Sequence, residues 1–129
     1  MSTRPIDEQS GEQLAAVSEG LVGLHREFYG KGPERTKTFA VNDTILCMLY
    51  GGFTATEQTL ITEGEGAEVE SLRHRVQSTM RKRSVAVVEE AVGRKVVAYM
   101  SQANTDPDIA VELFILEPQP EPLRGEHEL

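Results

Sequence analysis

Two short stretches of this chain are apolar on both faces of the strand that each is predicted to form. They are residues 44–50 (TILCMLY) and 109–116 (IAVELFIL), whose β-branched and aromatic residues favour strands. In the first stretch, one face carries Ile45, Cys47 and Leu49 and the other Leu46, Met48 and Tyr50. In the second, Val111, Leu113 and Ile115 lie opposite Ala110, Phe114 and Leu116, with Glu112 as the only charge. A sheet with one face in water alternates apolar and polar residues, so both faces of this sheet need cover.

Two arrangements would provide that cover. The helices could lie on both faces, or they could cover one face while a second subunit covers the other. We favour a homodimer, because symmetric dimers are the commonest assemblies and an open apolar face would aggregate. A charge on the outer face, for which Phe114→Glu is the first choice, is expected to give a monomer or an aggregate.

The helices follow from the period of the apolar residues. Spacings of three and four between residues 14 and 28 predict a helix that ends at the glycines before Pro33. A longer amphipathic stretch predicts a second helix with the buried stripe Val69, Leu72, Val76, Met80, Val87 and Ala91. The predicted elements are helix 11–29, strands 36–41 and 44–50, helices 55–63 and 67–92, and strands 94–101 and 109–116.

This order predicts an α+β fold, in which a four-stranded, mainly antiparallel sheet packs with helices. The order is helix, hairpin, short helix, long helix, hairpin, and its repeated helix–hairpin unit is compatible with an internal duplication. A chain of 129 residues can bury one core. We therefore expect a single domain over 11–117, with flexible polar termini at 1–10 and 118–129.

The junction GGFTATEQTL, at 51–60, links the second strand to the short helix. Gly51 and Gly52 break the strand. Thr54 and Glu57 match the capping-box pattern, in which each side chain bonds the other's free backbone N–H. The pattern predicts a helix start at residue 55 and assigns no chemistry to the junction.

The composition limits the possible functions. A net charge of −8 favours solubility and argues against general nucleic-acid binding. The single cysteine, Cys47, excludes an internal disulfide framework and is typical of a reducing cytoplasm. The N-terminus lacks the apolar stretch of a signal peptide, and no apolar run approaches the ~20 residues that span a bilayer. We expect a cytoplasmic protein that reaches any membrane through a partner.

The chain shows no recognisable catalytic, cofactor or metal pattern. His25, His74 and His127 lie far apart and lack the neighbouring ligands that a metal site needs. Cys47 lies in an apolar strand without a histidine placed to activate it. The pair in Asp106-Pro107-Asp108 is typical of a turn, and GKGP at 30–33 lacks the phosphate-loop pattern. We therefore predict a non-enzymatic protein without metal or cofactor.

One basic segment departs from the acidity of the chain. Residues 73–83 hold no acid and contain Arg73, Arg75, Arg81, Lys82 and Arg83. These five residues are candidates for binding an anionic partner, either nucleic acid or an acidic protein. The alternative, which we favour, is a solvated face whose cations pair with acids elsewhere in the chain.

Four segments together resemble the MpsC-like family, named after a sodium-translocating membrane-potential-generating system. They are FYGKGP at 28–33, GGFTATEQTL at 51–60, VEEAVGRKVVAYMS at 88–101 and DPDIAVELFIL at 106–116. The resemblance implies association with membrane proteins that take up cations or inorganic carbon, and it assigns no catalytic residues. Two hypotheses remain: the resemblance implies an accessory or regulatory protein of such a transport system, and the basic segment of the long helix suggests a nucleic-acid-associated regulator.

Overall fold

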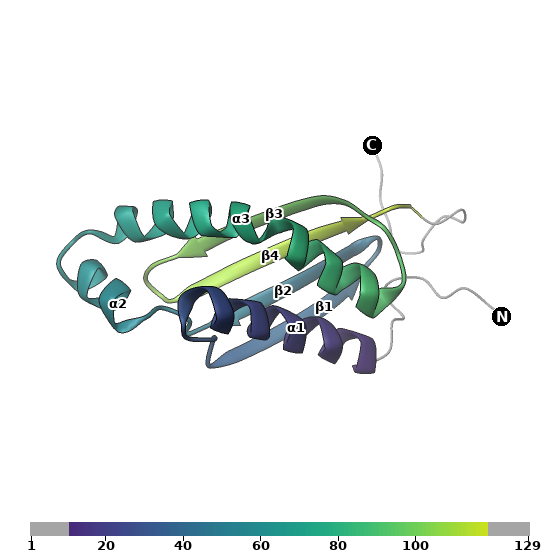
Figure 1. Ribbon diagram of the computed structural model, residues 1–129, viewed down its shortest axis with the longest axis horizontal. Coiled ribbons are helices and arrows are strands. Elements are labelled where there is room, and N and C mark those ends of the chain that lie inside the picture. Colours follow the sequence, from purple (N-terminus) through teal and green to yellow (C-terminus); the bar gives the residue numbers. More distant parts are fainter. Residues whose placement is uncertain (1–10, 119–129) are drawn as a thin grey trace.

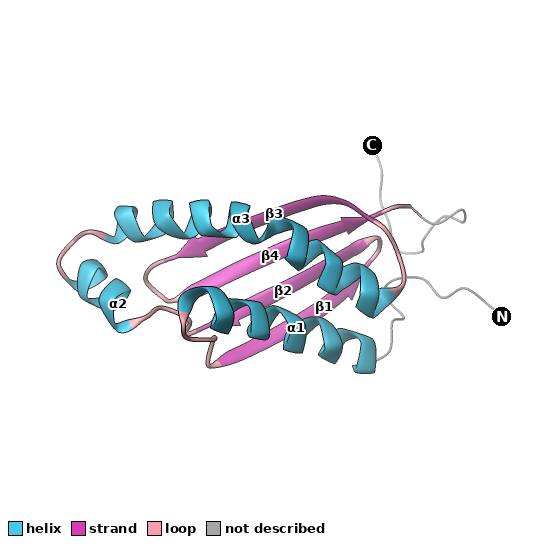
Figure 2. Ribbon diagram, in the orientation of Figure 1, coloured by secondary structure: helices cyan, strands magenta, loops and turns pink. Residues whose placement is uncertain are grey.

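The computed structural model describes residues 11–118 and shows an α+β fold (Figure 2). The predictions of flexible termini fall on residues that lie almost entirely outside this range. The elements, in chain order, are α1 (Gly11–Tyr29), β1 (Arg35–Val41), β2 (Thr44–Tyr50), α2 (Ala55–Thr62), α3 (Gly66–Val92), β3 (Val96–Asn104) and β4 (Ile109–Leu116). The predicted fold class and element order are confirmed, and most bounds differ by two residues or fewer.

The four strands form one antiparallel sheet in the order β1-β2-β4-β3. Both long helices lie on the same face of this sheet, α1 beside β1 and α3 beside β3 (Figure 1). The two helix–hairpin units thus occupy equivalent places, with the second strand of each hairpin at the centre. This is the arrangement that an αββ duplication would produce.

The central strands place one apolar face under the helices. Ile45, Cys47 and Leu49 of β2 are buried there, and β4 adds Phe114 and Leu116. Phe114 is fully buried, so the choice of Phe114→Glu as an outer-face substitution was wrong. Strand alternation puts its neighbour Leu113 on the opposite face, and that residue is the correct position for such a test.

The helices approach each other closely because α1 carries a glycine at the crossing. A Cβ atom at Gly20 would lie 2.5 Å from Cγ1 of Val87 on α3. The buried face of α1 consists of Val17, Leu21, Leu24 and His25, close to the predicted stripe. Helix α1 therefore packs against both α3 and the sheet.

The predicted stripe of α3 is only partly correct. Val69 and Met80 are buried, but Leu72 is 50% exposed. The buried face of this helix consists of Val69, Arg73, Gln77, Met80, Ser84, Val88 and Val92. Three of these positions carry polar side chains, and two of them have polar partners: Arg73 bonds Glu57 and Gln77 bonds Ser101. A search for apolar periodicity does not detect such positions.

Helix α2 begins with the predicted capping box. The hydroxyl oxygen of Thr54 accepts a hydrogen bond from the Glu57 backbone N–H at 3.2 Å, and the Glu57 carboxylate accepts one from the Thr54 N–H at 2.9 Å. Both bonds satisfy donors that the first turn of a helix leaves free. The short helix therefore has a defined start at the end of the GGFTATEQTL junction.

Replacing Thr54 with alanine removes the acceptor of this cap. We expect the free energy of unfolding to fall by ~1 kcal/mol, within the usual range for N-cap residues. Chemical denaturation followed by circular dichroism measures the change. Thr56→Ala is the matched control, because Thr56 is exposed in the first turn of the same helix. Equal losses in the two variants would contradict the role of Thr54.

Candidate functional site

A buried ion pair lies at the end of the molecule where α2 meets α3. Arg73 and Glu57 are 3% and 6% exposed. The guanidinium donates from Nε to Oε2 of Glu57 at 2.7 Å and from Nη2 to Oε1 at 2.6 Å. It also lies over the rings of Tyr29, at 3.6 Å from the centroid, and Phe53, at 5.0 Å. The pair fixes α2 to α3. Its contacts give a structural reason for Phe53 and Glu57 in the junction at 51–60.

The backbone around Phe53 is held by three other parts of the chain. The N–H of Phe53 donates to the Asp108 carboxylate at 3.0 Å, and its carbonyl accepts from Lys31 Nζ at 3.0 Å. Arg73 donates to the carbonyl of Gly52 at 2.9 Å. Three of the four segments that carry the family resemblance therefore meet around Phe53. The contacts of Lys31, Arg73 and Asp108 with the backbone of residues 52 and 53 are called the joint below.

The ion pair keeps Glu57 charged. Burial alone would raise the pKa of this carboxyl, but the hydrogen bonds from Arg73 and from the Thr54 backbone outweigh burial, and the charge of Arg73 adds to them. The pKa of Glu57 is therefore lowered from its usual value. Glu57 is thus both the second member of the capping box of α2 and one half of the ion pair.

A second polar cluster lies in the core, between α1, α3 and the sheet. Glu112 of β4 is fully buried, and its Oε1 accepts a hydrogen bond from the Tyr99 hydroxyl at 2.6 Å. Its Oε2 lies 3.6 Å from Nε2 of His25, which is itself 2% exposed. The other ring nitrogen of His25, Nδ1, lies 2.9 Å from the carbonyl of Leu21 and can donate to it. The three side chains lie in a row, from His25 on α1 to Glu112 on β4 and then to Tyr99 on β3.

The electrostatics of this cluster favour a neutral Glu112. Burial raises the pKa of this carboxyl, and the nearby His25, the hydrogen bond from Tyr99 and the neighbouring Ser84 hydroxyl oppose the effect only in part. Burial also raises the pKa of Tyr99, and it raises that of Tyr29 to about 12. A protonated Glu112 can donate from Oε2 toward His25, while its Oε1 accepts from Tyr99.

Several atoms of the core lack a hydrogen-bond partner within residues 11–118. They include Nε2 of His25, Oε2 of Glu112, Nε2 of Gln77 and Oγ of Ser84. Polar atoms that are buried without partners cost free energy. The cluster is therefore a place where protonation can change stability.

The other candidate residues from the sequence are structural where the structure describes them. Cys47 is fully buried, and burial raises the pKa of its thiol to about 11, which leaves little reactive thiolate. Asp108 is part of the joint, and Gly30 and Lys31 belong to the turn after α1. His127 lies outside the described residues.

The structure separates the five basic residues of 73–83. Arg73 is buried in its ion pair, and Arg83 pairs with Glu27 on α1. Arg75, Arg81 and Lys82 are exposed, and none of them forms an ion pair with a carboxylate of residues 11–118. Arg83 thus pairs with an acid on an exposed face as predicted, whereas Arg73 pairs with one but is buried and not part of a solvated face. Partner binding by the other three residues stays a prediction.

The face of the sheet opposite the helices is open in the described part of the chain. Its exposed apolar side chains include Phe39 at 46%, Val41 at 60% and Met100 at 52%. The central strands contribute Leu46, Met48, Tyr50, Val111, Leu113 and Ile115, all partly exposed. The helices therefore cover one face of the sheet, and the face beyond them is a contiguous apolar surface.

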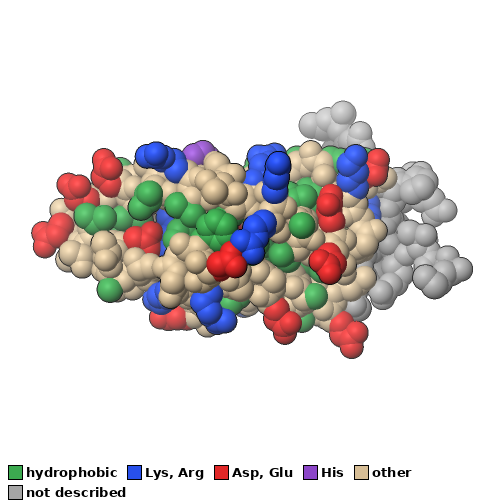
Figure 3. Space-filling model, in the orientation of Figure 1, with side chains coloured by type: hydrophobic (Ala, Val, Ile, Leu, Met, Phe, Trp, Pro, Cys, Tyr) green, Lys and Arg blue, Asp and Glu red, His purple; other side chains and the backbone are tan. Residues whose placement is uncertain are grey.

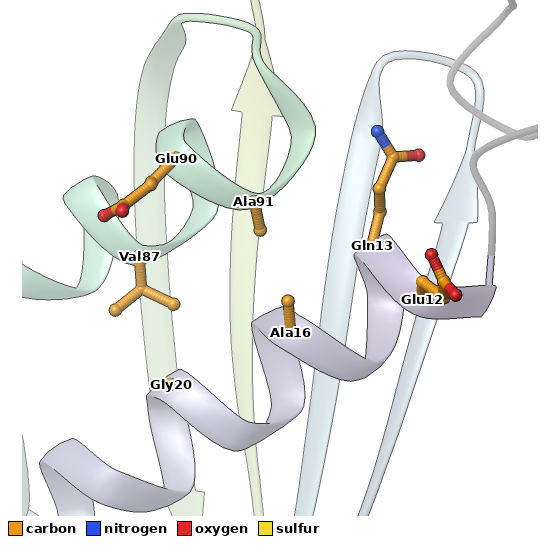
Figure 4. A pocket seen from close by; sticks show the side chains of 7 residues that line it. All are labelled: Glu12, Gln13, Ala16, Gly20, Val87, Glu90 and Ala91. Carbon is orange, nitrogen blue, oxygen red and sulfur yellow. The ribbon is translucent and has the colours of Figure 1, made fainter.

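The helical side carries a hollow of about 430 Å³ between α1 and α3. Figure 4 shows Ala16 and Gly20 on α1 facing Val87 and Ala91 on α3. Glu12 and Glu90 lie at its rim with Gln13. Small side chains of both helices line this hollow, and no histidine, cysteine or cation of the described part of the chain does so.

Neither the buried ion pair of Arg73 and Glu57 nor the buried cluster around Glu112 was predicted from the sequence. Glu112 stood out as the only charge in an apolar strand, and that was the available signal for a core cluster. Its partner His25 is one position after Leu24 of the apolar stripe, where a histidine attracts no notice. Arg73 was assigned to the surface because nothing in the order of residues links it to Glu57.

In residues 11–118, no helix combines the length and apolar character that crossing a bilayer requires. The family described as "Na+-translocating membrane potential-generating system (MpsC)" matches residues 9–118. The Bacillus subtilis (strain 168) protein named "Uncharacterized protein YrhF" is 34% identical over 96 residues, which are 73% of this chain and 79% of that protein. No solved structure matches the chain. The family match spans most of the sequence and confirms the resemblance, so the chain belongs to the MpsC family.

Proposed function

We propose that this protein is a non-enzymatic, cytoplasmic accessory or regulatory component of a membrane system that transports cations or inorganic carbon. The family description, which names a Na+-translocating system that generates membrane potential, supports the setting. The observation that carries the proposal is the open apolar face of the sheet. Large apolar patches on folded proteins mark sites of association with other proteins.

The position of the titratable groups supports a non-enzymatic role. A general acid or base must come within hydrogen-bond reach of its substrate. His25 and Glu112 are 2% and 0% exposed, beneath both helices. The exposed Arg81 shares a hollow with His74 and Ser78, but the Ser78 hydroxyl donates to the backbone carbonyl of His74 at 3.0 Å and is not paired with the imidazole. Association accounts for these features better than catalysis does.

The occupant that we propose for the open face is a second copy of the chain. Four strands of seven to nine residues make a face of roughly 20 Å by 25 Å, at spacings of ~4.8 Å between strands and ~3.3 Å along them. Two such faces would bury roughly 1,000 Å², which reaches the lower bound for a specific interface. Arg35 and Lys37, at one end of β1, are the only charged residues that strand alternation places on this face.

Leu113→Glu places a charge at the centre of this face and is expected to convert the dimer into a monomer. Burial of an unpaired carboxylate would outweigh the apolar gain of the interface. Light scattering coupled to size exclusion measures the mass. Leu72→Glu is the matched control, because the same substitution there falls on a leucine that is half exposed on α3. A Leu113→Glu variant that keeps the mass of the unmutated protein would contradict the interface.

The cellular role is tested by tagging the chromosomal copy and purifying it from native membranes. We expect a subunit of an ion- or bicarbonate-transporting membrane complex to co-purify. We also expect deletion of the gene to lower the membrane potential, with recovery from the unmutated gene. Unchanged potential, cation uptake and bicarbonate uptake in the deletion strain would contradict the proposal. Recovery of nucleic acid, with an affinity that falls steeply with salt, would instead support the alternative regulator.

A further inference from the structure

Strand β3 is an edge of the sheet, and it is nine residues long. An edge strand leaves a row of backbone N–H and C=O groups without a neighbouring strand. Two hollows follow this edge where it runs beside α3, with volumes of about 340 and 180 Å³. Arg81 and Tyr99 line both hollows, so the two lie next to each other along β3, and together they are called the groove below.

The lining shows that the groove follows the edge of β3. Tyr99 and Ser101 belong to the side of the strand that faces the helices, whereas Ala98 and Met100 belong to the open side. Both sides of one strand can line a single hollow only along its free edge. The residues from β3 run from Val96 to Ser101, which corresponds to about 20 Å of extended chain.

The groove carries positive charge without a matching acid. Arg81 and Lys82 are exposed at its rim, and neither forms an ion pair within residues 11–118. Among residues 11–118, no aspartate or glutamate lines the groove, although the chain has a net charge of −8. Figure 3 shows Lys and Arg side chains along the upper edge of the molecule, where Figure 1 places α3 and β3.

A second copy of the chain does not fit this edge. Two β3 strands paired across a twofold axis would bring Arg81 and Lys82 of both copies into one groove, and like charges at an interface cost free energy. An acidic chain has the complementary charge. The exposed Val97, at 53%, offers an apolar contact to such a chain.

We propose that the groove beside β3 is a docking site for an extended acidic segment of a partner protein, which adds to the sheet as a fifth strand. Backbone hydrogen bonds along the edge supply affinity in this mode of recognition, and alternate side chains supply specificity. Acidic residues on one side of the segment pair with Arg81 and Lys82. Apolar residues of the segment lie near Val97, which lines the groove. The expected motif alternates acidic and apolar residues over about six positions.

A labelled peptide of four glutamates alternating with four valines, blocked at both ends, tests the charge requirement. Fluorescence anisotropy with the full chain is expected to show saturable binding. The Arg81→Glu/Lys82→Glu variant is expected to weaken it at least tenfold. Arg75→Glu is the matched control, because Arg75 is exposed on the same helix outside the groove, and it is expected to change the affinity less than twofold. Absence of binding, or equal loss in both variants, would overturn the proposal.

Hydrogen exchange with the same peptide tests the strand addition itself. Amide exchange in residues 96–102 is expected to slow when the peptide binds, while exchange in β1, the other edge strand, stays unchanged. A peptide in which lysine replaces each glutamate should give neither binding nor protection. Protection of both edges alike, or binding without protection of β3, would show charge attraction alone and would overturn the fifth strand.

Discussion

Replacing Arg73 with methionine is expected to lower the free energy of unfolding by about 3–5 kcal/mol, the usual cost of removing one partner of a buried ion pair. The substitution leaves the Glu57 carboxylate at 6% exposure with only its bond to the Thr54 N–H. It also removes the guanidinium from the rings of Tyr29 and Phe53. Urea denaturation followed by far-UV circular dichroism measures the loss in this chain without tryptophan.

The pair itself is isolated by a double-mutant cycle with Glu57→Gln. Glutamine can keep the capping bond to Thr54 while it removes the charge that Arg73 opposes. We expect the double variant to be clearly more stable than the sum of the two single losses predicts, because neither charge is then left alone. Arg75→Met, two residues away and exposed, should change stability by less than about 0.5 kcal/mol. Strict additivity in the cycle would contradict the ion pair.

Replacing Glu112 with glutamine is expected to change how stability depends on pH. The pKa of Glu112 is raised above its reference value of 4.5 in the folded protein, because the carboxyl is buried. The native state therefore holds this proton more tightly than the unfolded chain does. The contribution of Glu112 to stability is fully present below pH 4.5 and is lost as pH rises toward the folded pKa.

Glutamine cannot ionise, so it removes this loss. Its carbonyl can accept from Tyr99, and its amide can be directed toward Nε2 of His25, which lies 3.6 Å from Oε2 in the unmutated protein. We expect the stability of the variant relative to the unmutated protein to rise above pH 4.5, by up to about 1.4 kcal/mol per pH unit until the folded pKa is passed.

Denaturation curves between pH 4 and pH 8 measure this difference. Glu90→Gln, at an exposed position of α3, is the control and should show no such trend. Glu57 acts with the opposite sign, since its pKa is lowered and its contribution is lost as pH falls. A Glu112→Gln variant that loses stability equally at every pH would show that Glu112 is charged in the native core.

The secondary structure could be predicted because each element carries its own local signal. Three of these signals involve residues close together in the sequence, and the structure confirms all three. They are the apolar stripe of α1, the capping box of Thr54 and Glu57, and the Asn42-Asp43 turn. The two faces of β2 and β4 were also correct. Which face meets the helices could not be read from alternation, and this is why Phe114 was assigned to the wrong side.

The polar core escaped prediction because its partners are distant in the chain. Glu112 meets Tyr99 from the neighbouring strand and His25 from the first helix. Helix α3 places Arg73, Gln77 and Ser84 on its buried face at positions where an apolar search selects Val76 and Val87. From sequence alone, a polar residue in such a stripe is predicted to be exposed unless its buried partner is already known.

Sedimentation equilibrium of the unmutated protein tests the central claim most directly. The claim is that the open face of the sheet is covered by a second copy. We predict a single species at micromolar concentration with twice the chain mass of 14.2 kDa, and the mass of one chain for Leu113→Glu. A monomer of the unmutated protein at this concentration would contradict the dimer, and with it the use that we propose for this face.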